Sequence, residues 1–520
     1  MATQMKKFKI PLTILCGILH ILVVKNRDMV TFTMPENPRL YIYGIIGLAV
    51  VFCFLFYYFF FTVLQKLLTR DQKFWSYFKY FLGYFAFMSI FWLLTWPGIF
   101  KGDEFYVIQS AKNFTLSGGQ SGLTSIFYIV SLLFFPSMAT ITFVQLLIIC
   151  TIFAVLIHDM NEIVSGKRKY LLYVPFVLLP VIDGNLFTLR ATLVSWFFLF
   201  VICKLYYLIK TDRMTMKYAI FLSVLSGLLI AWRSEYIYMI LLLPFTLWFL
   251  KKINVKRALV LCVICFISYS LFQIPNKIAL NGSNKYPISL VLNPIANLFT
   301  EVETLKGPSV YDDVMEINKL VDAALLRQSA SVRNISQYWN IPEVLPEEQL
   351  SSFMKASLRL IVYNPGKFLK YRWQTFAYTN GLYPDRVNHP CGTVDSINQL
   401  VYYDMDYKTM FVFMNPPLGQ KLREKTISVL ACRTYGQEEI KTNALLPVFY
   451  NCIPVIVCML VLFVLSCRKK DKLNAMLVLI ISAQVVLIFL TAPAMFFMYY
   501  FCFYLSGYFM TALAIANCKK

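Results

Sequence analysis

The sequence is poor in charged side chains, and acidic residues are the scarcer kind. Charged residues make up 15% of the 520 positions, against about 25% in a typical soluble domain. Because apolar residues reach 58%, the composition excludes both a disordered chain and a water-soluble globular protein. Only three histidines are present, so neither a histidine-rich metal centre nor a Ser/His/Asp triad is expected. An integral membrane protein with many spans remains.

Long apolar runs are abundant. A hydrocarbon core of about 30 Å is crossed by about 20 apolar residues in a helix, and twelve segments are candidates for such spans. They are residues 9–24, 40–64, 80–98, 139–158, 170–182, 191–209, 218–232, 236–250, 258–273, 445–467, 473–491 and 495–516. A further apolar stretch, 124–135, is too short to span and predicts a helix at the membrane surface. The predicted fold is an all-α polytopic bundle of about twelve transmembrane helices.

Positive charges lie in short clusters between these apolar runs. This distribution explains the net charge of +22 by membrane topology, and no nucleic-acid partner is expected. With twelve spans, every basic cluster falls in an alternate loop or at a terminus. The clusters are 6–9, 66–79, 167–169, 210–217, 251–257, 468–472 and 519–520. The positive-inside rule therefore predicts that these loops and both termini are cytoplasmic.

The longest polar stretch, 274–444, is then extracytoplasmic, and its helical periodicity predicts a small, mostly helical domain. The chain divides into an N-terminal transmembrane hairpin (1–79), a seven-span module (80–273) with an outer loop at 99–138, this outer domain, and a three-span module (445–520). Of the 13 cysteines, only Cys391 and Cys432 fall in the outer domain. In an oxidising compartment they form one disulfide or remain two thiols.

Ionisable residues at the outer ends of spans are few, and they mark polar cavities because the bilayer excludes charge. Three outer loops contribute them, all at nearly the depth of the lipid headgroups. The set is Lys101, Asp103, Glu104, Asp183, Arg190, Arg233 and Glu235. Acids mixed with cations at this depth suit a reaction on an anionic lipid phosphate.

The loop after the third span carries the acidic pair Asp103-Glu104. Pro97 ends the preceding helix, and a helix that begins just before the pair places Asp103 and Tyr106 on one face. The alternative is structural: Asp103 caps this helix, and Glu104 is favoured by the positive end of the helix dipole.

Two arginines accompany the acids. Arg233 separates two apolar runs together with Glu235, and Arg190 precedes a span shortly after Asp183. A guanidinium binds phosphate through two parallel hydrogen bonds, which favours both arginines as phosphate ligands. The alternatives are an ordinary polar turn with Arg233 reaching the headgroups, and a structural pair of Asp183 with Arg190.

In this layout the sequence resembles the GT-C superfamily of polytopic glycosyltransferases, which includes the protein O-mannosyltransferases and the bacterial aminoarabinose transferase. The likeness rests on Gly102-Asp103-Glu104-Phe105-Tyr106 in a first outer loop, with 124–135 as a surface helix. The resemblance rests also on seven spans followed by a large outer insert. It extends over roughly residues 80–273. The sequence lacks a clear Trp-Trp-Asp motif of oligosaccharyltransferases and the Arg- and His-rich outer loops of O-antigen ligases.

The resemblance implies transfer of a sugar from a polyprenyl phosphate or diphosphate to an extracytoplasmic glycan, lipid or protein acceptor, with inversion. The implied base is Asp103, with Glu104 second. The implied phosphate-binding cations are Arg233, Arg190 and Lys101. Groups that orient these cations or bind the sugar are Glu235, Asp183 and Tyr106. No cofactor is required and no metal ligand is assigned, although a carboxylate pair is compatible with Mg²⁺ or Mn²⁺.

Two other classes of protein fit a polytopic chain. A flippase or transporter of lipid-linked sugars places charges near the bilayer midplane on broken helices, often with repeat symmetry. Here the charges gather at one face, and about a third of the chain forms a single insert. A non-catalytic scaffold for envelope assembly would bind through the outer domain and would need no pocket over Asp103.

Overall fold

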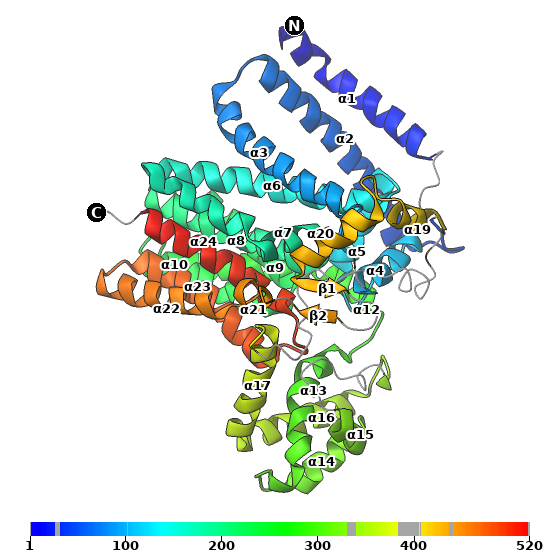
Figure 1. Cartoon of the computed structure of the whole chain (residues 1–520), viewed down its shortest axis with the longest axis vertical. Coiled ribbons are helices and arrows are strands. Elements are labelled where there is room, and N and C mark those ends of the chain that lie inside the picture. Colours follow the sequence, from blue (N-terminus) through cyan, green and yellow to red (C-terminus); the bar gives the residue numbers. More distant parts are fainter. Residues whose placement is uncertain are drawn as a thin grey trace.

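A computed structural model describes residues 2–25, 32–100, 102–329, 340–382, 405, 407–435, 440–442 and 444–517. These residues are mostly helical, and their one sheet pairs β1 (Arg433–Tyr435) with β2 (Ile440–Thr442) in antiparallel fashion. The helices of the bundle are α1 (Ala2–Lys25), α2 (Leu40–Leu68), α3 (Gln72–Leu94), α6 (Met138–Ile163), η1 (Lys167–Val177), α7 (Leu179–Leu186), α8 (Arg190–Lys210), α9 (Met216–Trp232), α10 (Met239–Phe249), α11 (Val255–Phe272), α22 (Ile453–Arg468), α23 (Lys472–Thr491) and α24 (Phe501–Ala516). The expected helical bundle is confirmed (Figure 1).

Shorter elements make up the rest of the described helices. Those in loops between the long helices are α4 (Gly102–Lys112), α5 (Gly122–Phe134), η2 (Ser234–Tyr236), α12 (Ile274–Leu280), α19 (Tyr407–Met414), α20 (Gln420–Leu430), α21 (Leu446–Phe449) and η5 (Phe497–Tyr499). Those of a projecting unit are α13 (Tyr286–Leu298), η3 (Phe299–Thr304), α14 (Val310–Asn318), α15 (Ala323–Ser329), α16 (Glu347–Tyr363) and α17 (Pro365–Thr379). Figure 1 shows this unit extending away from the bundle.

Seven helices of the described chain are long and apolar enough to cross a membrane, as an integral membrane protein requires. They are Leu40–Leu68, Gln72–Leu94, Met138–Ile163, Arg190–Lys210, Val255–Leu280, Leu446–Arg468 and Lys472–Thr491. The pair η1 and α7 passes the same test as one span bent by 55°. The other four predicted spans coincide with shorter apolar helices, which are Phe8–Val24, Met216–Trp232, Ser234–Phe249 and Phe501–Ala516. The number that crosses the bilayer stays a prediction.

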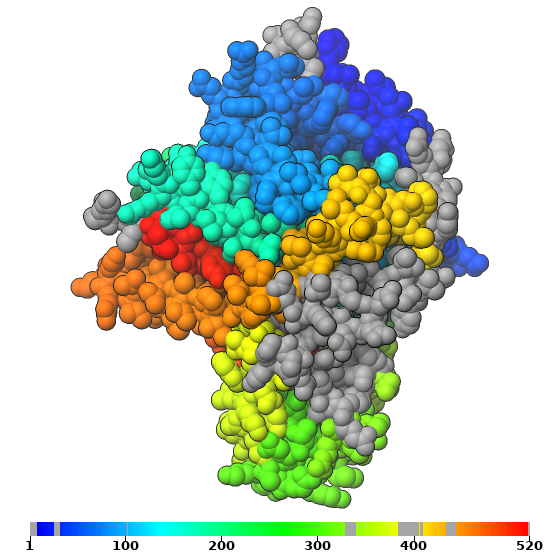
Figure 2. Space-filling model, viewed as in Figure 1, coloured from blue at the N-terminus to red at the C-terminus, as the bar shows by residue number. Residues whose placement is uncertain are grey.

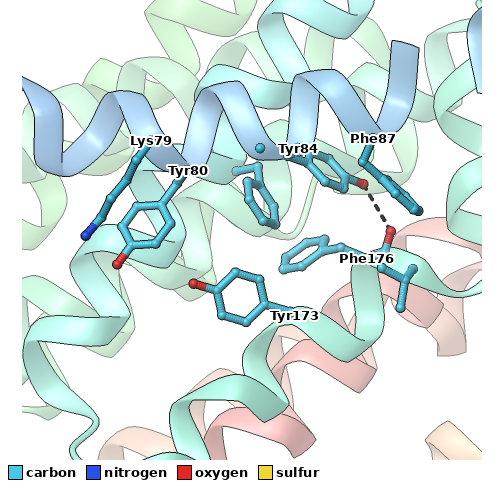
Figure 3. A pocket seen from close by; sticks show the side chains of 9 residues that line it. Lys79, Tyr80, Tyr84, Phe87, Tyr173 and Phe176 are labelled. Carbon is cyan, nitrogen blue, oxygen red and sulfur yellow. Dashed lines mark hydrogen bonds between the residues drawn. The ribbon is translucent and has the colours of Figure 1, made fainter. Parts of the chain in front are cut away.

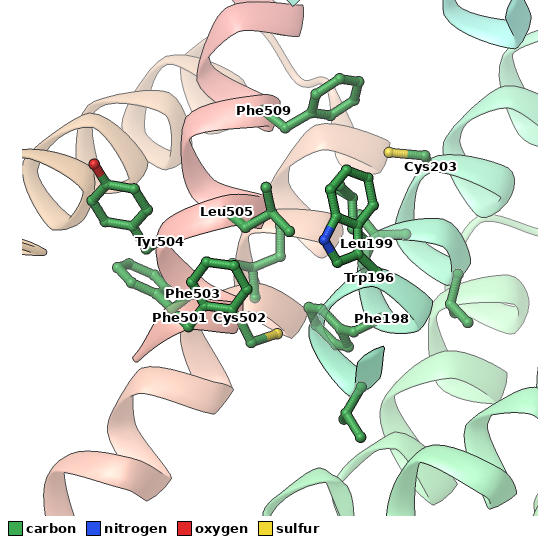
Figure 4. Packing of buried hydrophobic residues seen from close by; sticks show 14 of the residues in the cluster. Trp196, Phe198, Leu199, Cys203, Phe501, Cys502, Phe503, Tyr504, Leu505 and Phe509 are labelled. Carbon is green, nitrogen blue, oxygen red and sulfur yellow. The ribbon is translucent and has the colours of Figure 1, made fainter. Parts of the chain in front are cut away.

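The centre of the bundle is formed by α6, α8 and α24. Most of the apolar stretch of α6 (72%) and of α8 (78%) is buried, against 22% for α2 and 11% for α3. Trp196 and Phe198 of α8 lie beside Cys502 and Leu505 of α24 in the shared core (Figure 4). The helices α2 and α3 therefore present most of their surface to lipid.

Small residues let α9 and α11 approach closely. A Cβ atom at Gly227 of α9 would lie 2.6 Å from Cβ of Ser268 and 2.8 Å from the carbonyl oxygen of Cys265. Helices in lipid associate mainly through such close packing, because the lipid provides no hydrophobic drive between them. Gly227 is thus a packing residue of this helix pair.

The bend between η1 and α7 has a cause in the sequence. Pro180 has no N–H, so the carbonyl of Phe176 lacks the donor that an α-helix supplies four residues later. The Tyr84 hydroxyl donates to that carbonyl at 3.1 Å, and Asn185 Nδ2 donates to the Tyr84 oxygen at 2.9 Å. Trp196 Nε1 in turn donates to Asn185 Oδ1 at 2.7 Å. This buried network holds the bend against α3 and α8.

In the range predicted as one outer domain, 274–444, the described residues after α12 include two separately packed parts. Helices α13 to α17 form a unit with its own apolar core, in which Leu292, Ile295, Phe353 and Leu360 are buried. A separate core forms because these helices have apolar faces that the bundle does not cover. These helices agree with the helical character that the periodicity of this range predicts.

Arg372 of α17 joins this unit to α23. Its Nε donates to the carbonyl of Phe489 at 2.7 Å and its Nη2 to the carbonyl of Ala492 at 2.9 Å. The Phe489 carbonyl lacks its helical donor because the residue four positions later is Pro493. The guanidinium, whose residue is 1% exposed, thus completes the C-terminal end of α23.

The second part of the range, 407–435, packs against the bundle. Phe413 of α19 contacts the rings of Phe100 and Phe105, with centroids 5.5 and 5.6 Å away. Figure 2 shows this gold segment on the surface beside the blue of α3. Cys432, which follows α20, is buried with a free thiol, and Cys391 lies outside the described residues.

Candidate functional site

Loops from distant parts of the sequence meet at the end of the bundle that carries α4, α5 and α12 (Figure 1). Two of them are joined by a parallel bridge between Ile99 and Phe187, with the N–H of Ile99 donating to the carbonyl of Leu186 at 3.0 Å. Asp103 follows this bridge by four residues on one strand of chain, and Arg190 by three on the other. The pairing therefore brings the acidic loop and the start of α8 to the same place.

Helix α5 connects these loops to the end of α9. The Tyr128 hydroxyl lies 2.8 Å from Thr188 Oγ1, and Trp232 Nε1 donates to Thr124 Oγ1 at 2.9 Å. Asn276 of α12 joins the start of α5 to the end of α9 through hydrogen bonds to both backbones. The helix expected at 124–135 is therefore present as α5, and one of its faces is firmly packed against protein.

Arg233 and Glu235 form an ion pair directly after α9. Arg233 Nη2 lies 2.7 Å from Glu235 Oε1, and the arginine side chain is 4% exposed. The guanidinium carbon lies 5.7 Å from the centre of the Tyr499 ring in η5. Arg190 is close enough to the Glu235 carboxylate to interact with it electrostatically. The two arginines and Glu235 thus belong to one cluster, in which Arg233 is already held by a carboxylate.

Asp103 approaches the same tyrosine from the α4 side. Its carboxylate interacts electrostatically with Tyr499, as do Arg233 and Glu235. Asp103 is exposed and accepts a hydrogen bond from Gln120 Nε2 at 2.9 Å, whereas Glu104 is fully buried. Of the acidic pair, Asp103 is the carboxylate that a substrate can reach.

The remaining predicted residues lie at different distances from this cluster. Tyr106 is exposed on α4, one turn after Asp103. Asp183 is fully buried within α7, where the thiol of Cys432 is an electrostatic neighbour. Lys101 lies outside the described residues.

Sequence reasoning missed Tyr499, which falls within the range 495–516 that was predicted as a span. The helix α24 begins only at Phe501, because Pro493 ends α23 and the chain then turns through η5. The signal for such a break is the proline followed by an aromatic run at the head of the last apolar segment. Gln120, which holds Asp103, carried no local signal.

Two cavities in the described part of the chain lie among the long helices and are not lined by the predicted site residues. One measures about 250 Å³ between α3, α6 and η1, and the other about 320 Å³ between η1, α21 and α24. Within the described ranges, no group of three or more His, Cys, Asp or Glu side chains is placed to hold a metal ion. The site thus combines the exposed carboxylate of Asp103 with the ion pair of Arg233 and Glu235, all within electrostatic reach of Tyr499.

No protein-family model matches this sequence, and comparisons with curated proteins and with solved structures find no match either. The chain's own residues are therefore the basis for a functional proposal.

Proposed function

We propose that this protein is a membrane glycosyltransferase of GT-C type, with a polyprenyl-phosphate- or diphosphate-linked sugar as donor. The observation that carries the proposal is that Asp103, Arg233 and Glu235 all lie within electrostatic reach of Tyr499, and Arg190 within that of Glu235. Ionisable residues at the ends of membrane helices are candidates for function, since the bilayer penalises charge. An exposed carboxylate near guanidinium groups supplies the base and the phosphate ligands that such a transfer needs.

In the proposed reaction the acceptor hydroxyl oxygen bonds to the anomeric carbon, on the face opposite the lipid phosphate. The bond from that carbon to the phosphate oxygen breaks, and the lipid phosphate leaves with the electron pair, so the configuration inverts. Asp103 takes the hydroxyl proton, and the Gln120 amide orients its carboxylate. Arg190 and Arg233 stabilise the charge on the departing phosphate, with Glu235 fixing the position of Arg233.

The supporting roles follow from exposure. Tyr106, exposed one turn from Asp103, binds sugar hydroxyls, while buried Glu104 serves as the weaker base candidate. Lys101 and Asp183 keep their proposed roles as a further cation and an orienting carboxylate. The reaction needs no cofactor, because the proton and the phosphate charge are both handled by side chains.

Substitution of the base tests the proposal. Asp103→Asn should lower transfer from a panel of polyprenyl-phosphate-linked hexoses in membranes by about 10²–10⁴-fold, the usual contribution of a general base. Asp212→Asn is the matched control, since Asp212 is another exposed aspartate, at the far end of α8. Arg190→Gln should raise the donor KM more than the acceptor KM. Full transfer by Asp103→Asn at equal expression would remove the assignment of the base.

We further propose twelve membrane crossings, both termini in the cytoplasm and the site on the extracytoplasmic face, supported by the basic clusters 167–169 and 468–472. A cysteine at exposed Ser351 of α16 should react with an impermeant maleimide on intact cells. One at exposed Lys469 should react only after permeabilisation, with the unmodified chain as background. The reverse pattern would invert the topology.

A lipid-linked sugar flippase or transporter is the second candidate, favoured by the bent span η1–α7. Transporters bind substrates at discontinuous helices, and the 55° bend here lies close to buried Asp183. A flippase should move lipid-linked sugar across proteoliposomes without an acceptor, whereas a transferase should release lipid phosphate only when an acceptor is present. A scaffold for envelope assembly should do neither.

A further inference from the structure

An aromatic groove lies on the side of the bundle that faces lipid, between α3, α6 and η1. It encloses about 250 Å³ and has Tyr84, Phe153 and Phe176 as its buried floor (Figure 3). Only 11% of the apolar stretch of α3, which forms one wall, is buried. The groove therefore opens where membrane lipid surrounds the bundle.

One end of this groove is polar and positively charged. Lys79 lies there with its Nζ 4.9 Å from the centre of the Tyr80 ring, and within the described residues it forms no ion pair. The hydroxyls of Tyr80 and Tyr173 lie at the same end (Figure 3), where Asn161 Nδ2 donates to the Tyr80 oxygen at 3.0 Å. An ammonium without an acidic partner, beside hydroxyl donors, is suited to an anionic oxygen.

Gly83 keeps the middle of the groove open. It lines the groove on α3, one turn from Tyr80 and from Phe87. A Cβ atom at this position would meet no atom within 4 Å, so packing does not require a glycine here. The space beside Gly83 is therefore free of side chains and has room for a hydrocarbon chain.

We propose that the aromatic groove binds one acyl chain of an anionic glycerophospholipid, whose phosphate lies at Lys79 and the Tyr80 and Tyr173 hydroxyls. Pockets that enclose a whole drug-sized ligand measure about 300–1,000 Å³. A groove of about 250 Å³ therefore suits a single hydrocarbon chain with the headgroup outside.

Charge decides which lipid is preferred. The basic run 167–169 forms the first turn of η1, whose later residues line the groove, and adds to the positive field of Lys79. A zwitterionic phospholipid offers the same chain but no net charge, and juxtamembrane basic residues favour anionic lipids. The neighbouring cavity between η1, α21 and α24 has no cation among its lining residues, and the proposal does not extend to it.

The bound chain would also cover the bend of η1–α7. Tyr84 and Phe176, which share the hydrogen bond at the bend, both line the groove. The lipid site is separate from the proposed sugar transfer and stands without it, because it involves none of the residues assigned to that reaction.

Native mass spectrometry of the full chain, released from detergent containing phosphatidylglycerol and phosphatidylcholine, tests the lipid site. The unmodified chain should retain one phosphatidylglycerol in preference to phosphatidylcholine. Lys79→Gln should weaken phosphatidylglycerol retention about fivefold, the effect of one basic residue at an anionic surface. Gly83→Leu, which fills the open space, should reduce retention of both lipids.

The matched controls come from the same region. Gly47→Leu on α2 also projects into open space, and Lys73→Gln removes another exposed lysine of α3. Both should retain lipid as the unmodified chain does. If Gly83→Leu fails to fold, Val177→Trp narrows the groove from an exposed position of η1 and serves as the second blocked variant.

Three outcomes would overturn the proposal. One is equal retention of phosphatidylglycerol by the unmodified chain and Lys79→Gln. Another is reduced phosphatidylglycerol retention in Lys79→Gln but unchanged retention in a folded variant with a filled groove. That result would show that the lipid contacts the protein only through its headgroup. Displacement of the lipid by excess inorganic phosphate would show a site for free phosphate.

Discussion

Replacing Arg372 by methionine should loosen the unit α13 to α17 from the bundle. Methionine keeps much of the length and the apolar stem but removes every donor of the guanidinium. The carbonyls of Phe489 and Ala492 then lose their hydrogen bonds of 2.7 and 2.9 Å, and Asn293 Oδ1 loses one of 3.3 Å. The perturbation therefore falls on the end of α23 and on its contact with α17.

The size of the effect follows from two opposing contributions. A hydrogen bond from a charged donor contributes about 1.5–3 kcal/mol, so the two bonds to carbonyls contribute about 3–6 kcal/mol. Burial lowers the pKa of Arg372 to about 10, which shows that the site disfavours the charge, and methionine relieves this desolvation. We expect the free energy of unfolding to fall by about 2–4 kcal/mol.

Amide hydrogen exchange of the full chain measures this loss locally. Arg372→Met should speed exchange in α17 and at the end of α23, with little change in α6 and α8. Arg327→Met is the matched control, because Arg327 pairs with Glu303 at the surface, with both side chains at least half exposed. Its effect should stay within about 0–1 kcal/mol.

A second substitution decides whether the proline explains the role of Arg372. Pro493→Ala restores a backbone N–H for the Phe489 carbonyl. In this background Arg372→Met should therefore lower the free energy of unfolding by about 1–3 kcal/mol less than it does in the unmodified chain. An unchanged penalty, or equal effects of Arg372→Met and Arg327→Met, would refute the reasoning.

Two further predictions concern acid stability and helix packing. Hydrogen bonds from Tyr371 and Lys370 lower the pKa of Glu301 to about 2 from its ordinary 4.5. The folded unit therefore binds this proton more weakly than the unfolded chain, and stability present above about pH 4.5 is lost as the pH falls towards 2. Amide hydrogen exchange in α13 to α17, measured as the pH is lowered, should show a smaller loss of stability in Glu301→Gln than in the unmodified chain. The difference should be under about 1 kcal/mol, since the Glu301 side chain is partly exposed. Gly227→Leu should force α9 and α11 apart, because its Cβ would lie 2.6 Å from Cβ of Ser268. Such overpacking destabilises a fold by about 1–3 kcal/mol or more, so the unfolding temperature should fall. If either variant behaves as the unmodified chain does, that result contradicts the corresponding contact.

Hydropathy alone located the long apolar helices of the bundle. All twelve predicted spans, and the shorter stretch 124–135, coincide with helical segments. The physical reason is that a segment in lipid must satisfy its backbone internally, so a long apolar run folds as a helix whatever its neighbours are. The position of the bend at Pro180 and the late start of α24 were not predicted, because they depend on which side chains replace lost backbone donors.

The rarity of charge was also readable in the sequence, and it singled out Asp103, Arg190, Arg233 and Glu235. Only the tertiary structure decided which of them approach one another. The bridge of Ile99 with Phe187 and the packing of α24 against α8 determine that neighbourhood. Local composition reports that a charge is unusual, whereas the distance between two charges depends on contacts between residues far apart in the chain. The division of 274–444 into two parts, and the roles of Tyr499 and Arg372, arise from the same long-range packing.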